Sequence, residues 1–436
     1  MPGSPAIAAT SSTSSISTGI SPPATSLRVA DSGRRGASAG AVLRAVLEDG
    51  PIARSTIARV TGLSPASVTG HCSELAELGL LRELPDQVRS NGAGRPHIPV
   101  DIDVTRHLAA AVHIAVRMTT VALLDLRGRV VARQQMPHDA APTAPPTPTP
   151  TAIVERAARS IAELYAAHGG GARLLGVGVA TGGWVDPEAG VVMDHPRLGW
   201  SLVPLRDLLS ERTGLPVYVD GHSRALLHAE VLFGEARRVG SVLHVFVGNV
   251  VDAAFATRGE AHYGSRAQAG AIAHFPVEGS REPCACGRVG CLEAAVSEET
   301  LTRRAHERGI VGAPDIRTLF EAARGGDSAA TELFVERSRQ VGRAVALLMD
   351  VFGPERVVVT DPTLPYLPRA LNALRIAARE NVRTVCDVDS VLMPTSFPGQ
   401  VLEIAGGAVL LDALYRNPLG AINSEDLNVD TVGRFR

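Results

Sequence analysis

"HFPVEGSREPCACGRVGCLEA", residues 274–294, gathers three of the five cysteines of the chain and one histidine in a single glycine-containing loop. The four residues, at spacings of ten, two and five, are His274, Cys284, Cys286 and Cys291. In a reducing compartment, clustered cysteines are more often metal ligands than disulfides. Three thiolates and one imidazole can complete a closed tetrahedral zinc site. The other two cysteines, Cys72 and Cys386, lie far from this loop and are expected to be small packing residues.

Length and composition are those of a globular protein without a membrane segment. With 436 residues the chain has room for two or three domains, and its apolar fraction of 45% is ordinary. No apolar run reaches the length that spans a bilayer, and the N-terminus lacks the regions of a signal peptide. We therefore expect a cytoplasmic protein with no membrane partner. Because the net charge is only -2, any DNA-binding surface must be local.

The N-terminal part changes from low complexity to helical periodicity. Residues 1–37 are rich in Ser, Thr, Pro and Ala, and we expect them to be disordered. The apolar face of a first helix is formed by Val42, Leu43, Val46 and Leu47. A second helix, "RSTIARVTG", ends at Gly62, and a third follows in "LSPASVTGHCSELAELGLLREL". In the third helix Ser64 is the expected N-cap, with Pro65 in the first helical position.

Two short helices joined through "TGLSP" indicate a winged helix-turn-helix DNA-binding domain over residues 38–100. The third helix would lie in the major groove and present its N-terminal residues to the bases and phosphates. The expected contacts are Ser64, Ala66, Ser67, Thr69 and His71. A following hairpin supplies Arg89 and Arg95 as wing residues that contact the backbone or the minor groove. The alternative is a helical bundle that only packs or dimerises.

Residues 101–436 have the pattern of an α/β module. The segment "HLAAAVHIAVRMTTVALLDLRGRVVARQQM" predicts three strands with a turn at Arg127-Gly128. A proline-rich loop over residues 137–152 follows, with a helix at about 151–168. Further strands are expected at "LLGVGVA", "LPVYVD", "SVLHVFVG" and "RVVVTD".

The segment "CACGRVGCLE" matches, without a gap, the C-x-C-G-x-x-G-C-x-E signature of the ROK family (repressors, open reading frames and kinases). The "GRP" at 94–96 is typical of the repressor branch, and the resemblance covers about residues 38–420. It implies an actin-like, two-lobed sugar-kinase fold of the α/β class behind the winged helix-turn-helix, with ligand between the lobes. It also implies that the zinc ion is structural and orients the loop that carries sugar contacts.

Three glycine-rich turns that hold ATP phosphates in kinases of this family are altered here. The D-x-G-G-T turn corresponds to "HIAVRMT" (113–119), and the G-T-G-x-G-x-G turn corresponds to "GNVVDAA" (248–254). The third turn, near the adenosine, corresponds to "VVVTDP" (357–362). Because backbone N–H groups in such turns cradle phosphates, their loss predicts no ATP binding, no catalytic residues and no enzymatic activity.

The sugar-binding motifs are retained only in part. The family's N-D-A-N appears as "VDGH" (219–222), and its G-E-x-G-H appears as "GAIAH" (270–274), so that Ala271 replaces a glutamate. The resemblance implies ligand contacts from Gly182, Gly183, Asp220, His222, His274 and Glu293. Asp220 has an alternative role as the cap of the helix that follows it. Trp184 and Trp200 lie near these segments and either stack on a sugar or belong to the core.

These features favour a repressor of carbohydrate-metabolism genes that binds operator double-stranded DNA and is released by a sugar-type effector. A homodimer or homotetramer is expected, because a two-fold protein matches a palindromic operator. Alternatives are an ATP-dependent sugar kinase with a DNA-binding arm, and a regulator whose sugar site has decayed. Zinc sensing is disfavoured, because a closed site binds its ion too tightly to respond to modest changes.

Overall fold

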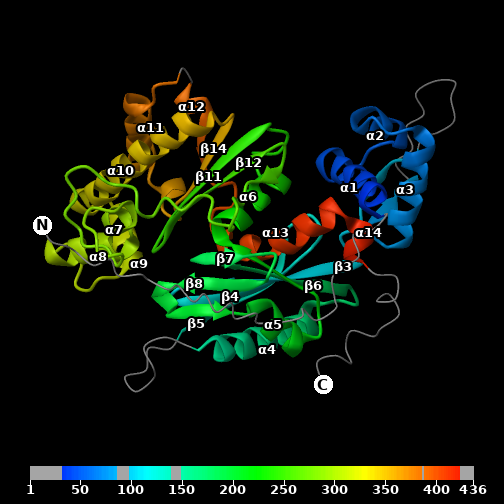
Figure 1. The fold of residues 1–436 in the computed structure, drawn as a ribbon, viewed down its shortest axis with the longest axis horizontal. Helices are drawn as coiled ribbons and strands as arrows, with labels where there is room; N and C mark the ends of the chain where they lie inside the picture. The colour runs from blue at the N-terminus through cyan, green and yellow to red at the C-terminus, as the bar shows by residue number, and fades with distance from the viewer. Residues whose placement is uncertain (1–31, 86–97, 139–148, 385–386, 423–436) are drawn as a thin grey trace, which may run out of the picture.

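The computed structural model describes residues 32–85, 98–138, 149–384 and 387–422. These residues form an N-terminal domain and two lobes, each lobe built on a five-stranded sheet (Figure 1). No helix in the described ranges combines the length and the hydropathy that crossing a membrane requires.

Three helices and a short strand pair make up the N-terminal domain. They are α1 (Ser32–Asp49), α2 (Arg54–Thr61), α3 (Pro65–Glu77), β1 (Leu81–Glu83) and β2 (Val100–Ile102). The four predicted apolar residues of the first helix are all buried in the core of this domain, as is Cys72. Ser64 caps α3 as predicted, because its Oγ accepts the backbone N–H of Ser67 at 3.1 Å.

The predicted boundaries of this domain need correction. Helix α1 begins at Ser32, so the expectation of a disordered tail up to residue 37 is wrong for its last six residues. The reason is tertiary packing, since Gly36 lies against Asn417 of the C-terminal segment. At the other end, β2 continues to Ile102, past the boundary expected at residue 100. The predicted wing residues Arg89 and Arg95, and Cys386, lie outside the described residues.

The first lobe is a sheet with strand order β10-β6-β3-β4-β5. Its strands are β3 (His107–Ile114), β4 (Met118–Leu124), β5 (Val130–Pro137), β6 (Arg173–Thr181) and β10 (Val217–Gly221). One face is covered by α4 (Pro150–His168) and α5 (Leu205–Thr213) (Figure 1). A small sheet of β7 (Trp184–Asp186), β8 (Val191–His195) and β9 (Trp200–Val203) adjoins it. Because α4 begins at Pro150, the proline-rich loop expected over 137–152 ends earlier than predicted.

The second lobe is a sheet with strand order β13-β12-β11-β14-β15. Its strands are β11 (Ser241–Val247), β12 (Val251–Thr257), β13 (Glu260–Ala261), β14 (Arg356–Thr360) and β15 (Leu392–Pro394). Its remaining helices are α7 (Leu292–Val296), α8 (Glu298–Glu307), α9 (Ile316–Arg324), α10 (Ser328–Phe352), α11 (Pro368–Asn381) and α12 (Val388–Val391). The strands predicted from the sequence are therefore present in both lobes.

Two helices lie between the two sheets, α6 (His222–Leu232) and α13 (Val401–Arg416) (Figure 1). Both are buried along nearly their whole length. Glycines bring α13 close to the first sheet: a Cβ on Gly178 would lie 2.1 Å from the carbonyl oxygen of Gly406. A Cβ on Gly406 would in turn lie 2.7 Å from the backbone of Val112. Helix α13 is thus the element on which the lobes are assembled.

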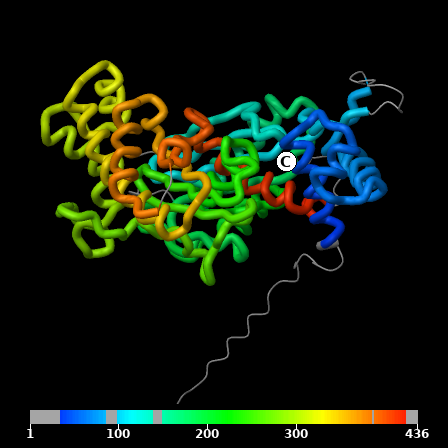
Figure 2. Tube along the Cα trace, turned by 90° about the horizontal axis from the view of Figure 1, so that it is seen from above, coloured from blue at the N-terminus to red at the C-terminus, as the bar shows by residue number. Residues whose placement is uncertain are grey.

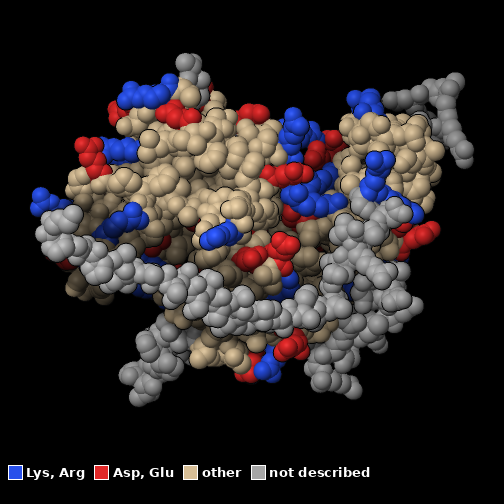
Figure 3. Space-filling model, viewed as in Figure 1, with Lys and Arg blue, Asp and Glu red and all other residues tan. Residues whose placement is uncertain are grey.

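The N-terminal domain packs on the C-terminal end of α13. Helix α1 lies beside α13 and α14 (Pro418–Ala421), as Figures 1 and 2 both show. A Cβ on Gly40 would lie 2.5 Å from the carbonyl oxygen of Arg416. Arg238, before β11, also pairs with Glu48 and Asp49 at the end of α1. Figure 3 shows acidic and basic side chains gathered where the N-terminal domain meets the rest of the molecule.

Two glycine-to-alanine substitutions test this packing. Alanine in place of glycine within an exposed helix stabilises it by up to about 1 kcal/mol. We expect that gain for Gly70→Ala on α3, where no atom lies within 4 Å of the added Cβ. Gly40→Ala should instead destabilise the protein by about 1–3 kcal/mol, because its Cβ meets backbone atoms of α13. Urea unfolding checks both, and equal stabilisation by the two variants would contradict the observed docking of α1.

Candidate functional site

The four predicted metal ligands lie together in the loop that precedes α7. The ligand atoms of His274, Cys284, Cys286 and Cys291 are all within 4.8 Å of one another. The Sγ atoms of Cys286 and Cys291 are 3.7 Å apart, and Cys284 Sγ is 3.6 Å from His274 Nδ1. A tetrahedral zinc ion with ordinary bond lengths requires about 3.8 Å between two sulfurs and about 3.6 Å between sulfur and nitrogen. The thiols are free rather than disulfide-bonded, and their spacing fits zinc.

The backbone of the loop is held in place by its own hydrogen bonds. The N–H of Cys284 donates to the carbonyl of Arg288, and the N–H of Gly290 donates to the carbonyl of Glu282, both at 2.8 Å. Gly287 and Gly290 have φ of 83° and 78°, a conformation that favours glycine. The Glu282 carboxylate accepts hydrogen bonds from Arg303 and Arg304 on α8, which ties the loop to the second lobe.

The pKa values of two neighbouring thiols in the group are shifted in opposite directions. Arg288 Nε donates to Cys286 Sγ at 3.4 Å, and this hydrogen bond lowers the pKa of Cys286 to about 6. Burial raises the pKa of the neighbouring Cys291 to about 11. Because the two sulfurs are in contact, they hold two negative charges together only when a positive ion lies between them. His274, Cys284, Cys286 and Cys291 would hold the zinc ion, which supplies a cross-link within this loop.

The predicted glycine turn of the ligand cleft lies between β6 and β7. Gly183 has a φ of 78°, and a Cβ there would be 2.4 Å from the carbonyl oxygen of Asp194. A Cβ on Gly182 would lie 3.3 Å from His195 Nε2 and 3.6 Å from a methyl group of Val250. Both glycines therefore allow β8 to lie close to this turn, and Val250, at the altered phosphate turn, lies beside Gly182.

Asp220 lies at the end of β10 and is only 2% exposed. Its Oδ1 accepts hydrogen bonds from Arg224 Nε at 2.6 Å and from the N–H of Gly221 at 2.7 Å. Its Oδ2 accepts one from the Tyr263 hydroxyl at 3.3 Å. The N-cap of α6 is Gly221, without a side-chain cap, so the alternative role of Asp220 as the helix cap is wrong. The carboxylate is instead held by an arginine one helical turn later.

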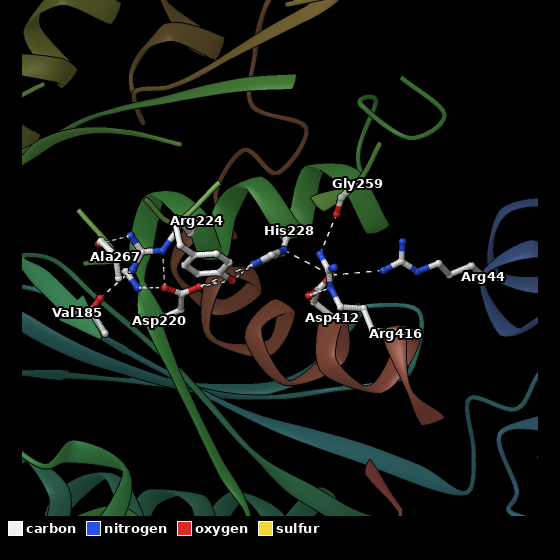
Figure 4. A network of polar contacts seen from close by, with 11 residues as sticks. Arg44, Val185, Asp220, Arg224, His228, Gly259, Ala267, Asp412 and Arg416 are labelled. Carbon is white, nitrogen blue, oxygen red and sulfur yellow. Dashed lines mark hydrogen bonds and ion pairs between the residues drawn. The ribbon is translucent and has the colours of Figure 1, made fainter. Parts of the chain in front are cut away.

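Arg224 also joins the two lobes. Its Nη2 donates to the carbonyl of Val185 on β7 at 3.0 Å, and its Nη1 donates to the carbonyl of Ala267 at 3.1 Å (Figure 4). Since Val185 belongs to the first lobe and Ala267 to the loop after β13, one buried guanidinium bridges both. The sequence reasoning missed Arg224, although its i, i+4 spacing from Asp220 was a usable signal.

The other predicted ligand residues lie in separate environments and do not form one group. His222 is buried against Phe246, with ring centroids 4.1 Å apart, and burial keeps its pKa well below the ordinary value. Glu293 accepts the N–H of Val251 at 3.1 Å and lies 3.8 Å from Arg197 of the first lobe. Trp200 belongs to the core, whereas Trp184 Nε1 donates to the carbonyl of Arg266. His274 belongs to the metal group.

At each of the three altered phosphate turns, backbone or side-chain groups of the protein contact one another. The turn after β3 is a tight hairpin, with the N–H of Ala115 donating to the carbonyl of Met118 at 2.9 Å. At the β11–β12 turn, Asn249 donates to the carboxylate of Glu298 at 3.1 Å. After β14, Asp361 pairs with Arg337 at 3.5 Å. At the second turn a carboxylate therefore occupies the hydrogen-bonding position beside Asn249.

The α3 surface differs from the prediction at one residue. Ala66 and Thr69 are exposed and Ser67 is half-buried, whereas His71 is only 8% exposed and lies 3.7 Å from Glu74. The burial of His71 leaves little of its side chain available for DNA, whereas Ala66 and Thr69 are accessible. Arg59 on α2 and Arg82 on β1 are also exposed. The sequence analysis did not include them among the expected DNA contacts.

The fold and the site together define a sugar-kinase-like protein preceded by a three-helix domain. Residues 109–389 match the model of the ROK family. The transcriptional regulator Rv0485 of Mycobacterium tuberculosis (strain H37Rv) is 35% identical, over 92% of this chain and 90% of that protein. The chain belongs to the ROK family, which confirms the resemblance seen in the sequence.

Other relatives and solved structures agree. The DNA-binding transcriptional dual regulator NagC of Escherichia coli K12 is 28% identical, over 80% of this chain and 86% of its own. A ROK family transcriptional regulator, a homologue of the E. coli Mlc protein, superimposes with a TM-score of 0.72 at 22% identity. It covers 88% of this chain and 97% of its own. A Streptomyces griseus ROK family glucokinase with bound glucose and AMPPNP superimposes with a TM-score of 0.60 at 23% identity. This match covers 69% of the present chain and 98% of the glucokinase chain. These structures confirm the predicted two-lobed α/β fold.

Zinc analysis of the purified protein tests the metal group. We expect one zinc ion per chain by mass spectrometry and its loss in Cys286→Ser, because a closed site needs all four ligands. Cys72→Ser, which alters a buried thiol of the N-terminal domain, is the matched control and should keep the ion. Retention of zinc by Cys286→Ser at the wild-type level would contradict the assignment.

The pH dependence of stability tests His228, a buried residue of α6 that faces Asp220, Tyr263 and Asp412. Burial by itself lowers the pKa of His228, but the charge of Asp412 and the contact with Asp220 outweigh it and raise the pKa to about 9. The folded state thus favours the charged ring. Its stabilisation is complete below the ordinary value of 6.5 and is lost as the pH rises through about 9.

The expected result is a pH-dependent difference between wild type and His228→Gln. The advantage of the wild type in free energy of unfolding should fall by on the order of 3 kcal/mol between pH 6 and pH 9.5. Denaturant unfolding at several pH values measures it. Parallel stability profiles for the two proteins would show that His228 does not carry this charge.

Proposed function

We propose that this protein is a transcriptional repressor that binds operator DNA through its N-terminal domain and a sugar-type effector through the cleft between its lobes. The observation that carries the proposal is the combination of a capped, exposed α3 with a kinase-like module whose phosphate turns are closed. Relatives named as transcriptional regulators over most of the chain support it. Phosphoryl transfer is disfavoured, because the three turns that would hold ATP phosphates have lost most of their glycines.

DNA would be read by the N-terminal half of α3. The Ser64 cap fixes the start of this helix, and Ala66, Ser67 and Thr69 follow on the side away from the core. Small side chains allow the helix to approach the floor of the major groove. Arg59 and Arg82 supply positive charge for phosphates, as would the predicted wing residues Arg89 and Arg95.

A sugar-type effector would contact the cleft at Gly182, Gly183, Asp220, His222 and Glu293. A hydroxyl group that approaches Asp220 has to compete with Arg224, which already donates to this carboxylate at 2.6 Å. The effector would therefore weaken or replace the Asp220–Arg224 ion pair, because this carboxylate already accepts hydrogen bonds. The zinc loop would position His274 and Glu293 at one side of the cleft, and a homodimer or homotetramer would present two copies of α3 to a palindromic site.

A second candidate is a regulator without a small-molecule effector. The Asp220–Arg224 ion pair favours it, because Arg224 already satisfies this carboxylate and also donates to Val185 and Ala267. The activity of such a protein would be set by its concentration or by a protein partner.

A fluorescence-anisotropy titration distinguishes the two candidates. The full-length, zinc-replete protein is titrated against the DNA upstream of its own gene at fixed salt, since affinity depends steeply on salt. A panel of mono- and oligosaccharides is then added. Specific binding that one saccharide releases establishes the first candidate, and specific binding that none alters favours the second. Failure to bind any specific DNA would overturn both.

A charge on α3 tests the reading surface. Ala66→Glu should weaken DNA binding at least about tenfold, because the new carboxylate faces the phosphates of the groove. It should not unfold the helix, since an acidic residue near a helix N-terminus is favourable. Ala313→Glu, the same change in the exposed turn between α8 and α9, is the control and should bind as the wild type does. Equal affinities for both variants would exclude α3 as the reading helix.

A further inference from the structure

We propose that a buried charge network couples the cleft carboxylate Asp220 to helix α1 of the N-terminal domain. The network consists of Arg224, Asp220, Tyr263, His228, Asp412, Arg416 and Arg44 (Figure 4). Its members come from β10, α6, α13, α1 and the loop after β13. It therefore connects parts of the molecule that are far apart in the sequence.

The network begins in the cleft. Asp220 is shared between Arg224 on one oxygen and Tyr263 on the other, and its Oδ2 lies 3.8 Å from His228 Nε2. The Tyr263 hydroxyl also contacts His228 Nε2, at 3.4 Å. The position of this carboxylate is thus set by groups that also contact the His228 ring.

The middle of the network is a contact between the two helices that lie between the sheets. His228 on α6 presents its other ring nitrogen, Nδ1, to Asp412 Oδ1 on α13 at 3.4 Å. Both side chains are at most 10% exposed. The imidazole lies between two carboxylates, one at the cleft and one toward the N-terminal domain.

The network ends on α1. Asp412 Oδ1 is 3.6 Å from Arg44 Nη2, and its Oδ2 accepts a hydrogen bond from Arg416 Nε at 2.5 Å. Arg416 Nη2 donates to the carbonyl of Gly259, in the turn between β12 and β13, at 2.8 Å. Asp412 Oδ1 has no well-directed hydrogen bond within the described residues, so only charge holds it to His228 and Arg44. That oxygen is the link most easily changed by a shift of α6.

Burial of Asp220, Arg224, His228 and Asp412 makes these four residues act together, while Arg44 and Arg416 at the end of the network are partly exposed. A charged group shielded from water is unfavourable unless an opposite charge stays beside it, so loss of one member leaves the next unpaired. A change in the contacts of Asp220 alters its electrostatic interaction with His228. The interaction of His228 with Asp412 then changes, and with it the attraction between Asp412 and Arg44. This inference extends the proposed function, because it states how an effector at Asp220 would be felt by the DNA-reading domain.

The first experiment measures hydrogen exchange of the full-length protein without DNA or ligand. Asp220→Asn should increase exchange of α1, residues 32–49, at least threefold, although Asp220 does not touch that helix. Glu403→Gln is the matched control: Glu403 is a buried carboxylate on α13 that pairs with Arg133 outside the network. It should leave exchange of α1 unchanged. Equal effects of the two variants on α1 would overturn the proposal.

The second experiment runs in the opposite direction, because coupling between two sites is reciprocal. Arg44→Gln changes a side chain that is 27% exposed and should fold even if Asp220→Asn does not. It should increase exchange of residues 217–224 in the cleft, and the double variant should show less than the summed effects. Unchanged exchange in the cleft, or strict additivity, would overturn the coupling. Since neither experiment contains DNA, failure of DNA binding would refute the proposed function and leave this result intact.

Discussion

The Asp412 carboxylate is the point on which the arrangement of this protein depends. It is buried on α13, where it faces His228 of α6, Arg416 of its own helix and Arg44 of α1. A buried carboxylate without these partners would be strongly destabilising, so the three helices are held together wherever Asp412 stays ionised. Its pKa lies well below the ordinary value, because the charges of His228 and Arg416 outweigh the opposing effect of burial. This one side chain therefore contacts α1 of the N-terminal domain and α6 between the lobes, beside the packing of Gly40 and the Arg238 ion pairs.

This arrangement also explains how a kinase-like cleft can serve regulation. In a kinase of this family the aspartate corresponding to Asp220 would remove a proton from the sugar. Here Arg224 donates a hydrogen bond to the carboxylate, and the three turns that correspond to phosphate turns have lost most of their glycines. The carboxylate that would act as a base in a kinase is here in contact with Arg224 and His228 of α6.

Much of this could be predicted from the sequence, because the signals were local. The cluster of His274 and three cysteines followed from cysteine spacing, the cap of α3 from Ser64-Pro65, and the strands from apolar runs. The spacings Asp220–Arg224 and Asp412–Arg416 each indicate a helical ion pair. The meeting of these pairs through His228 could not be predicted, since it depends on how α6 and α13 pack between the sheets. The burial of His71 and the start of α1 at Ser32 likewise depend on tertiary contacts.

Selection of bound sequences from a random double-stranded DNA library tests the central claim most directly, because the protein itself then selects its operator sequence. If α3 reads DNA as part of a symmetric assembly, a single motif should be enriched. That motif should be an inverted repeat with half-site centres about 10 base pairs, or a multiple, apart. Recovery of sequences with no common motif, from zinc-replete full-length protein, would contradict the account of this protein as a sequence-specific regulator.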